Sequence, residues 1–250
     1  MMTAYFDEAS GKDFTVVGGW VASVEDWDNF EVDWKLFLIN YKVPYFHMKE
    51  ISQFKGPFKK FENVPNFRAR FLQDAWDVIK FRVKRGFVCG IQHVLFNRIN
   101  RSYQLEESFA SCYALAGREA MDWANRYSHI AARDEVKCIF EDGGPNKGGL
   151  IKAADVEPTV SRPVFEPSRD IQDRKKGKRR GLVQIQAADF LAYEVRKFWV
   201  DHPLYRSGER KPRESLRLFG DKRPDTKLMS EERIFATCQR YSIPPRNKNG

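Results

Sequence analysis

Three acidic residues lie far apart in this sequence, and each follows or interrupts an apolar segment that belongs in a core. They are Asp7 in TAYFDEAS, Glu141 in KCIFEDGG and Asp189 in QIQAADFLAYE. Removing a carboxylate from water is costly unless a nearby charge compensates it. Several carboxylates that meet at one point are best compensated by a hard divalent cation. We therefore look for a fold that brings these three segments together.

The composition favours one folded domain with an anionic partner. The chain has 250 residues, of which 42% are hydrophobic and 14% aromatic, enough for a buried core. The formal net charge of +9 favours nucleic acid over a neutral metabolite as the partner. A soluble basic protein without such a partner is about as common.

The sequence predicts a cytoplasmic protein that does not bind membranes. MMTAYFDEAS lacks the features of a signal peptide, and no apolar run approaches the length of a membrane span. The four cysteines are widely spaced, so we expect reduced and mostly buried side chains. They are Cys89, Cys112, Cys138 and Cys238.

The first part of the chain predicts a β-hairpin followed by helices. Residues 3–7 and 14–22 are typical strands, joined by the polar EASGKD. Ser23 and Asp26 resemble a capping box, and aromatic residues then recur at helical spacing up to residue 41. Residues 43–65 contain prolines and scattered aromatics, which indicate an irregular insertion.

The middle of the chain alternates between the two periodicities. An amphipathic helix is predicted from about residue 66, a strand at 87–96 and a long helical stripe at 105–123. We interpret His93, within that strand, as structural. A strand at 136–141 precedes a glycine-rich turn that has no GxxxxGK[ST] spacing.

The last part of the chain predicts a short helix near 149–155, a short strand near 163–167 and a basic loop at about 172–182. A helix then begins near residue 183, and Asp189 lies at the border of its apolar face. This order predicts one α/β domain with a mixed sheet flanked by helices over residues 1–201. Residues 202–250 are interpreted as a basic C-terminal extension whose end, PPRNKNG, is disordered.

The three acids suit phosphodiester hydrolysis with Mg²⁺ or Mn²⁺, which needs an activated water and charge neutralisation at the leaving oxygen. Asp7 at the end of one strand, Glu141 at the end of another and Asp189 near the start of a helix can meet at one sheet edge. Other interpretations exist: Asp7 with Glu8 can open a turn, and Glu141 can begin a loop. Asp189 is the most informative, because a solvated acid normally lies opposite the apolar face.

Two further groups of residues are candidates for the site. His47 and Glu50 share a helical face and can add a ligand or a proton shuttle, although a surface or satisfied core histidine is more common. A run of six basic residues in positions 174–180 adjoins the helix of Asp189 and can hold phosphates, although such runs are often solvated. The phosphate-binding candidates in this run are Lys175, Lys176, Lys178, Arg179 and Arg180.

The ordered set YFDEAS, VVGGWVAS, FHMKE, IFEDGG and QIQAADFLAYE resembles the domain of unknown function 3800 family, over roughly residues 5–196. The resemblance implies a ribonuclease H-like fold and a metal-dependent nuclease site. It implies that Asp7, Glu141 and Asp189 are the metal-binding acids. It further implies that Glu8 completes the first acidic pair and that His47 and Glu50 match a further His and acid. Gln186 matches the glutamine of a Q-x-x-D helix, and we predict that it binds substrate. The basic run and the C-terminal extension depart from the family pattern.

The sequence therefore predicts a divalent-metal-dependent nuclease that acts on RNA or DNA. An alternative is a non-catalytic nucleic-acid-binding module of a defence or mobile-element complex, which would need no metal at the three acids. A third possibility is a metal-dependent hydrolase of a small phosphorylated molecule, for which the basic run would be unnecessary.

Overall fold

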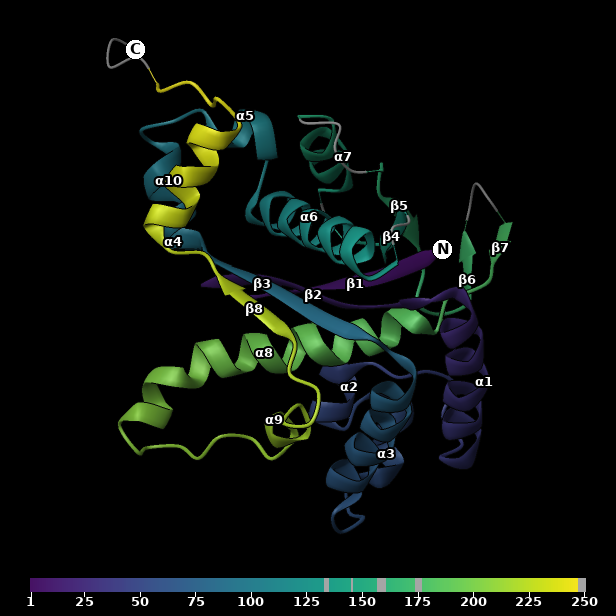
Figure 1. The fold of residues 1–250 in the computed structure, drawn as a ribbon. Helices are drawn as coiled ribbons and strands as arrows, with labels where there is room; N and C mark the ends of the chain where they lie inside the picture. The colour runs from purple at the N-terminus through teal and green to yellow at the C-terminus, as the bar shows by residue number, and fades with distance from the viewer. Residues whose placement is uncertain (133–134, 145, 157–160, 174–176, 247–250) are drawn as a thin grey trace.

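The computed structural model describes residues 1–132, 135–144, 146–156, 161–173 and 177–246. It contains a six-stranded mixed sheet with helices on both faces, and a small separate hairpin (Figure 1). The strands are β1 Met2–Ser10, β2 Phe14–Ser23, β3 Arg85–Gln92, β4 Val136–Glu141, β5 Val164–Glu166, β6 Ile171–Asp173, β7 Gly177–Arg179 and β8 Asp225–Leu228. The helices are α1 Val24–Asn40, α2 Met48–Gln53, the 3₁₀ helix Gly56–Phe61, α3 Phe67–Arg82, α4 His93–Asn100, α5 Leu105–Phe109, α6 Cys112–Ala132, α7 Lys147–Asp155, α8 Gln184–Arg206, α9 Ser215–Leu218 and α10 Glu231–Arg240. The predicted α/β class with a mixed sheet is confirmed.

The order of strands in the main sheet is β5-β4-β1-β2-β3-β8. The first three strands in sequence form an antiparallel meander, as the predicted hairpin requires. β4 joins β1 in parallel, β5 joins β4 in parallel, and β8 joins the far side of β3 in parallel. β1 is therefore a central strand, next to both the hairpin partner and the strand that carries Glu141.

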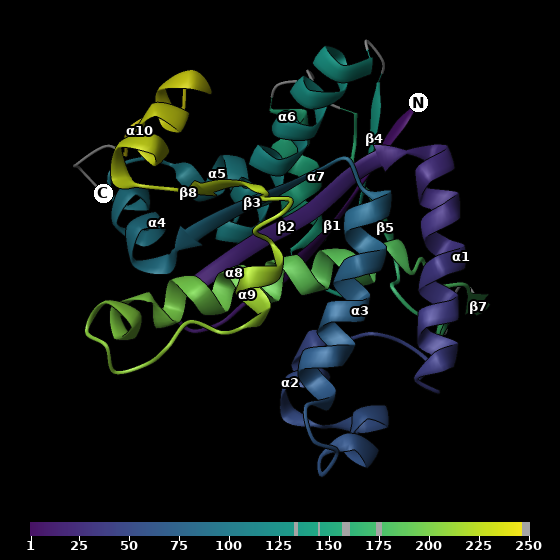
Figure 2. The same ribbon diagram turned by 60° about the horizontal axis from the view of Figure 1, so that its bottom comes forward.

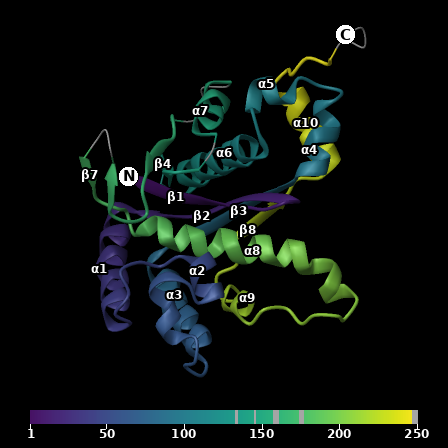
Figure 3. The ribbon, with the colours of Figure 1, turned by 180° about the vertical axis from the view of Figure 1, so that it is seen from behind.

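Each face of the sheet has its own hydrophobic core, because successive side chains of a strand point to opposite faces. On β1, Ala4 and Phe6 contribute to the core that includes α6, α7 and α10. Tyr5 and Ala9 contribute to the other core, with α1, α3 and α8. The two layers of helices are visible above and below the sheet in Figure 1 and from behind in Figure 3, and the view in Figure 2 brings α1, α3 and α8 forward.

The start of α1 follows the sequence prediction closely. The Ser23 side chain accepts a hydrogen bond from the Asp26 backbone N–H, which caps the helix. Trp27, Phe30 and Trp34 then point into the core on one face of the helix. All four cysteines are free and buried, as expected. Among the described residues, no helix is both long and apolar enough to cross a membrane.

Two segments differ from the prediction in their local structure. The segment 43–65 is not irregular throughout, because it forms α2 and a 3₁₀ helix that bury Met48, Ile51 and Phe58. The predicted strand 87–96 ends at Gln92, and His93 begins α4. Its backbone N–H donates to Asp13 O outside the sheet pairing, which turns the chain away from β2.

Three further predictions need correction. β1 continues to Ser10, so Asp7 lies inside the strand and not at its end. The stripe 105–123 is interrupted at Ala110, whose φ of 59° cannot continue a right-handed helix. The basic loop at about 172–182 contains the antiparallel hairpin of β6 and β7.

The predicted C-terminal extension belongs to the main domain. α8 runs through the expected boundary at 201 and ends at Arg206, and β8 then pairs with β3. α10 places Ile234 and Cys238 in the core of the sheet face that α6 covers. The predicted disorder of PPRNKNG does not extend to Arg246, whose backbone N–H donates to Ser102 O, and its last four residues, 247–250, lie outside the described residues.

If residues beyond 206 are part of the core, a cavity in α10 will destabilise the whole domain. We expect Ile234→Ala to lower the free energy of unfolding by about 2–5 kcal/mol, because Ile234 is fully buried. The matched control is Ile130→Ala in α6, since Ile130 is 84% exposed and its replacement will change stability by less than about 0.5 kcal/mol. Urea unfolding followed by tryptophan fluorescence measures both. Equal effects of the two changes would contradict this placement of α10.

Candidate carboxylate site

The strand pairing brings Asp7 and Glu141 next to each other. The parallel pairing of β1 with β4 ends at the pair Phe6 and Phe140, and Asp7 and Glu141 are the next residues of the two strands. Their side chains alternate with those of Phe6 and Phe140, so they lie on the face of Tyr5, the face that α8 covers. Two acids more than 130 residues apart thus share one sheet edge.

α8 adds the third acid because it packs unusually close to β2. Gly18 is the strand partner of Asp7, and a Cβ on Gly18 would lie 3.1 Å from both Cα and N of Ala192. A side chain at position 18 would require the helix backbone to shift by a few tenths of an ångström, so glycine permits this close approach. Asp189 lies three residues before Ala192, on the same side of the helix. The close approach therefore places Asp189 over the sheet edge where Asp7 and Glu141 lie.

The three acids line one cavity of about 180 Å³. Other residues with predicted roles also line it: Glu8, His47 and Gln186. The remaining wall comes from Tyr45, Phe46, Ser168 and Arg169, which the sequence analysis did not select. We call this cavity the carboxylate site.

Each of the three acids receives one hydrogen bond from the protein. The Met48 backbone N–H donates to Asp189 Oδ2 at 2.6 Å, and Ser168 Oγ donates to Glu141 Oε1 at 3.1 Å. Asp7 Oδ1 accepts from the backbone N–H of its neighbour, Glu8. Glu141 Oε2 is buried and has no hydrogen-bond partner within the described residues. The carboxylates are thus held in place while acceptor capacity remains unused.

The acids of this site differ from the neighbouring Asp142 in their charge compensation. Asp142 forms ion pairs with Arg179 and Lys147. In the described part of the chain, no lysine or arginine forms an ion pair with Asp7, Glu141 or Asp189. The adjacent acids Glu141 and Asp142 therefore have different environments: Asp142 forms two ion pairs that stabilise the fold, whereas Glu141 forms none within the described residues, and the more distant charge of Arg169 favours its ionised form.

The pKa values of the three acids reflect this crowding. Burial, together with the charges of Asp189 and Glu141, raises the pKa of Asp7 well above its usual range. Burial is also the main cause that raises the pKa of Glu141 to about 7 and of Asp189 to about 6. A positive ion in the cavity would lower all three, since it favours the charged form of each acid.

Glu8 lies on the other side of the strand from Asp7. It lines a second cavity of about 220 Å³ with Tyr113, Phe140 and Gly144, and Asp7 and Glu141 border both cavities. Ser10 donates a hydrogen bond to Glu8 Oε1, whereas Oε2 is buried without a partner. Burial raises the pKa of Glu8. Glu8 thus adds a fourth uncompensated acid at the edge of the carboxylate site.

His47 and Glu50 are adjacent, but only His47 lines the cavity. His47 precedes the first residue of α2, and its Nδ1 lies 3.2 Å from Glu50 Oε1. Glu50 Oε2 accepts a hydrogen bond from the Tyr45 hydroxyl at 2.8 Å. Glu50 therefore holds the Tyr45 hydroxyl and lies beside His47, whose Nδ1 has no hydrogen-bond partner among the described residues.

Gln186 connects the elements around the site. Its Oε1 accepts hydrogen bonds from Trp34 Nε1 and the Phe46 backbone N–H, each at 2.9 Å. Its Nε2 donates to the backbone carbonyl of Ser168 at 2.7 Å. The amide that was predicted to bind substrate is thus engaged within the protein. It holds the loop whose Ser168 hydroxyl orients Glu141.

A larger groove of about 710 Å³ continues from the carboxylate site and shares Tyr45, Ser168, Arg169 and Gln186 with it. The Arg169 guanidinium lies over the Tyr45 ring, 4.6 Å from its centroid. Lys35 and Arg180 also line the groove, as does the acid Asp170. Arg169 follows β5 in the loop PSRD, and a single basic residue after a short strand gives no signal in the sequence.

The residues of the predicted basic run have different environments. Lys175 and Lys176 lie outside the described residues, and Lys178 is exposed. Arg179 is largely buried and forms ion pairs with Asp142 and Glu166, so it stabilises the β5 region. Arg180 pairs with Glu31 of α1 but still lines the groove.

The donor chemistry of the site suits a divalent cation, but the carboxylates are not arranged around one. Among the described residues, no group of three or more His, Cys, Asp and Glu side chains has an arrangement that could hold a metal ion. The buried free oxygens of Glu8 and Glu141 and the mutual repulsion of the acids are nevertheless the features that oxygen-binding cations satisfy. Metal binding would require these side chains to move closer together.

Comparisons with known proteins give one finding. No family model matches the sequence, and no curated protein matches it. Among solved structures, the chain is similar to the ribonuclease H2 from Pyrococcus horikoshii OT3, with 12% sequence identity and a TM-score of 0.38. The match covers 88% of this chain and 98% of that chain. The function of this chain must therefore be inferred from its own side chains.

The raised pKa values predict an unusual effect of removing one acid in metal-free buffer. Because the folded pKa of Asp189, about 6, lies above its ordinary value of 3.8, the folded state binds more protons between these values. Its contribution to the free energy of unfolding therefore falls as pH rises from about 4 to about 6. Asp189→Asn removes this loss, so we expect the variant to be more stable than the wild type at pH 7, by at most roughly 3 kcal/mol.

The control for this experiment is Asp142→Asn, which removes an acid with two cationic partners and should lower stability at pH 7. Urea unfolding at pH 4 and pH 7 in EDTA gives the comparison. A loss of stability at pH 7 for Asp189→Asn as large as that for Asp142→Asn would show that Asp189 is compensated in the fold.

Proposed function

We propose that this protein is a divalent-metal-dependent phosphodiester hydrolase that acts on RNA or DNA. The observation that carries the proposal is the convergence of Asp7, Glu141 and Asp189 on one cavity without a cationic partner among the described residues. Buried acids that lower the stability of the fold in the absence of a cation are typical of a functional site that binds one. The proposed ligands are these three acids, with Mg²⁺ or Mn²⁺ as the ion.

When bound, the ion supplies charge neutralisation at the leaving oxygen and an activated water. The protein's own contribution is to fix the carboxylates. The N–H of Met48 holds one oxygen of Asp189, and the hydroxyl of Ser168 holds one oxygen of Glu141. Gln186 connects Trp34 of α1 with the Ser168 loop through two hydrogen bonds and so fixes the position of that loop. His47, supported by Glu50, lies within the cavity wall and is placed to donate or accept a proton.

The groove next to the site supports a phosphate-bearing polymer as the substrate. Arg169 lies at the junction of the cavity and the groove, and Lys35 and Arg180 lie farther along. Lys35 and Arg180 both pair with Glu31, so a phosphate of the strand would replace Glu31 as their partner, whereas Arg169 lies next to the acids themselves. A hydrolase of a small phosphorylated molecule would not need the extended groove. The aromatic ring of Tyr45 beneath Arg169 adds a surface on which a base can stack.

The resemblance to the domain of unknown function 3800 family supports the same proposal, because it selects the same three acids. Membership of the chain in that family remains part of the proposal. A second candidate function is a non-catalytic nucleic-acid-binding module. This candidate is favoured because the described residues contain no group of acids, histidines or cysteines already arranged to hold a metal ion. Binding of nucleic acid would need only the groove.

Metal binding and cleavage separate the two candidates. We expect the wild type to bind Mn²⁺ and to cleave at least one of RNA, DNA or an RNA–DNA hybrid. Asp7→Asn, Glu141→Gln and Asp189→Asn should each weaken Mn²⁺ binding and reduce the cleavage rate by about a hundredfold or more, because each removes a ligand charge. Calorimetric titration with Mn²⁺ and a gel assay of labelled substrates measure the two properties.

The control is again Asp142→Asn, whose acid is ion-paired and should leave the Mn²⁺ affinity unchanged within about threefold. Full activity of Asp189→Asn with added Mg²⁺ would reject the mechanism. Tight nucleic-acid binding without any Mn²⁺ binding would favour the non-catalytic module.

Binding to the groove should depend on salt through its arginines. Replacement of both Arg169 and Arg180 by Gln should lower the slope of log affinity against log salt by about 0.7 to 0.9 for each phosphate that these arginines neutralise. The double change Arg162→Gln with Arg82→Gln removes the same charge outside the groove and is the control. Fluorescence anisotropy with a labelled oligonucleotide in EDTA measures the slope without cleavage. Equal slopes for the two double variants would place the nucleic acid elsewhere.

A further inference from the structure

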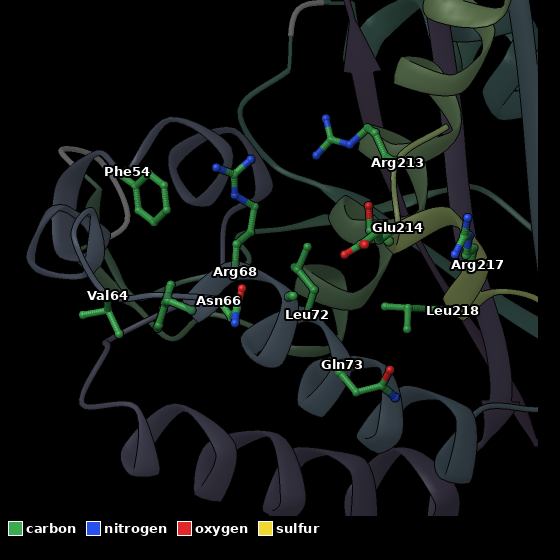
Figure 4. Close-up of a pocket in the computed structure, with 13 residues that line it drawn as sticks. Phe54, Val64, Asn66, Arg68, Leu72, Gln73, Arg213, Glu214, Arg217 and Leu218 are labelled. Carbon is green, nitrogen blue, oxygen red and sulfur yellow. The ribbon is translucent and has the colours of Figure 1, made fainter. Parts of the chain in front are cut away.

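A second pocket lies between the start of α3 and the segment that leads into α9. It has a volume of about 600 Å³. Figure 4 shows Phe54 beside Arg68 on one wall, and Arg213, Glu214 and Arg217 on the other, with Leu72 and Leu218 nearby. We call it the arginine pocket. It shares no lining residue with the carboxylate site or its groove.

The arginine pocket has positive charge that the described residues do not neutralise. Arg213 forms an ion pair with the fully buried Glu194 at 2.9 Å. Within the described ranges, no carboxylate forms an ion pair with Arg68 or Arg217, and Arg68 Nε is buried without a hydrogen-bond partner. Arg68, Arg213 and Arg217 carry three positive charges. Glu194 and Glu214 carry two negative charges, so one formal positive charge remains. The pocket therefore fits an anion.

The other walls of the arginine pocket are apolar and partly aromatic. The Arg68 guanidinium lies over the Phe54 ring, 5.0 Å from its centroid, and Phe67, Leu72 and Leu218 line the pocket as well. A small inorganic anion would leave this apolar surface in contact with water. A ligand that joins an anionic group to a flat, weakly polar ring would cover both kinds of wall, because rings stack on aromatic and guanidinium planes. A nucleotide has this chemistry.

Two helices connect the arginine pocket with the carboxylate site. α2 begins where the Met48 N–H binds Asp189, and it ends at Phe54, which lines the pocket. Its six residues span about 9 Å. α8 carries Asp189 and, farther along, Glu194, which holds Arg213 of the pocket. The two sites therefore share the elements α2 and α8.

We propose that the arginine pocket binds one nucleotide of the nucleic-acid strand whose phosphodiester bond lies at the carboxylate site. Arg68 and Arg217 hold its phosphate, and Phe54 contacts its base. The pocket thus positions the strand and takes no part in the reaction itself. This inference rests on the proposed function, but its test does not require cleavage.

The experiment measures binding of a labelled single-stranded oligonucleotide in EDTA, where no metal-dependent cleavage occurs. We expect the double variant Arg68→Gln with Arg217→Gln to bind about tenfold or more weakly than the wild type, since it cannot form two charge-assisted hydrogen bonds. The matched control is Arg70→Gln with Arg206→Gln, which removes the same charge at positions that do not line the pocket. The control should stay within about threefold of the wild type. Thermal unfolding of each variant checks the fold.

A competition experiment on the wild type avoids any question of misfolding. Adenosine 5′-monophosphate should displace the oligonucleotide at lower concentration than inorganic phosphate or adenosine, because only the nucleotide fills both parts of the pocket. Adenosine 5′-monophosphate should also raise the melting temperature of the wild type, but it should not raise that of the double variant Arg68→Gln with Arg217→Gln. Equal loss of affinity in both double variants, or equal competition by all three compounds, would overturn the inference. If the wild type binds through the pocket but cleaves nothing, the hydrolase proposal fails and the pocket assignment stands.

Discussion

The structure depends on the close packing of α8 against β2 at Gly18. The helix backbone at Ala192 lies 3.1 Å from the position that a Cβ at residue 18 would occupy, so the two elements pack in close contact. Farther along the same helix, the Trp199 ring covers Gly90 of β3 in a similar way. These two contacts fix the height and direction of α8 over the sheet. Without them, Asp189 would lie too far from the sheet edge to face Asp7 and Glu141.

Charge compensation separates structural acids from functional ones in this protein. Asp122 lies in the interior but is paired with Arg118 at 3.0 Å, and Asp142 is paired with Arg179. Such ion pairs offset the desolvation penalty of burying an acid. The acids of the carboxylate site have hydrogen bonds but no ion pair with a lysine or arginine among the described residues, and burial is the main cause that raises their pKa values. The site therefore accumulates a charge that a bound cation would stabilise.

Much of this arrangement could be predicted from the sequence because local signals carried it. Two strand-like segments joined by a polar turn predicted the hairpin, Ser23 predicted the start of α1, and the apolar face of α8 marked Asp189 as an exceptional acid. The sequence also selected Glu141 over many other acids because it ends a buried strand. Local signals cannot show that Glu141 and Asp7 are neighbours, since that depends on the parallel pairing of β1 with β4.

Other features depend on tertiary contacts and could not be predicted in this way. β8 has only four residues and becomes a strand because β3 offers a free edge. Gln186 was correctly placed near the site, but its three hydrogen bonds come from elements distant in sequence. Arg179 and Arg180 are adjacent in a basic run, yet one is buried in ion pairs and the other lines the groove. The sequence predicts what a segment contains more reliably than what surrounds it.

The central claim is that Asp7, Glu141 and Asp189 together bind a divalent cation. The most direct measurement is a crystal structure of the protein soaked with Mn²⁺, with data collected to record the anomalous signal of manganese. We expect an anomalous peak in the carboxylate site, with oxygens of the three acids at about 2.0 to 2.6 Å from the ion. A manganese-soaked crystal with no peak in this cavity, or with the peak bound only by acids elsewhere, would contradict the claim.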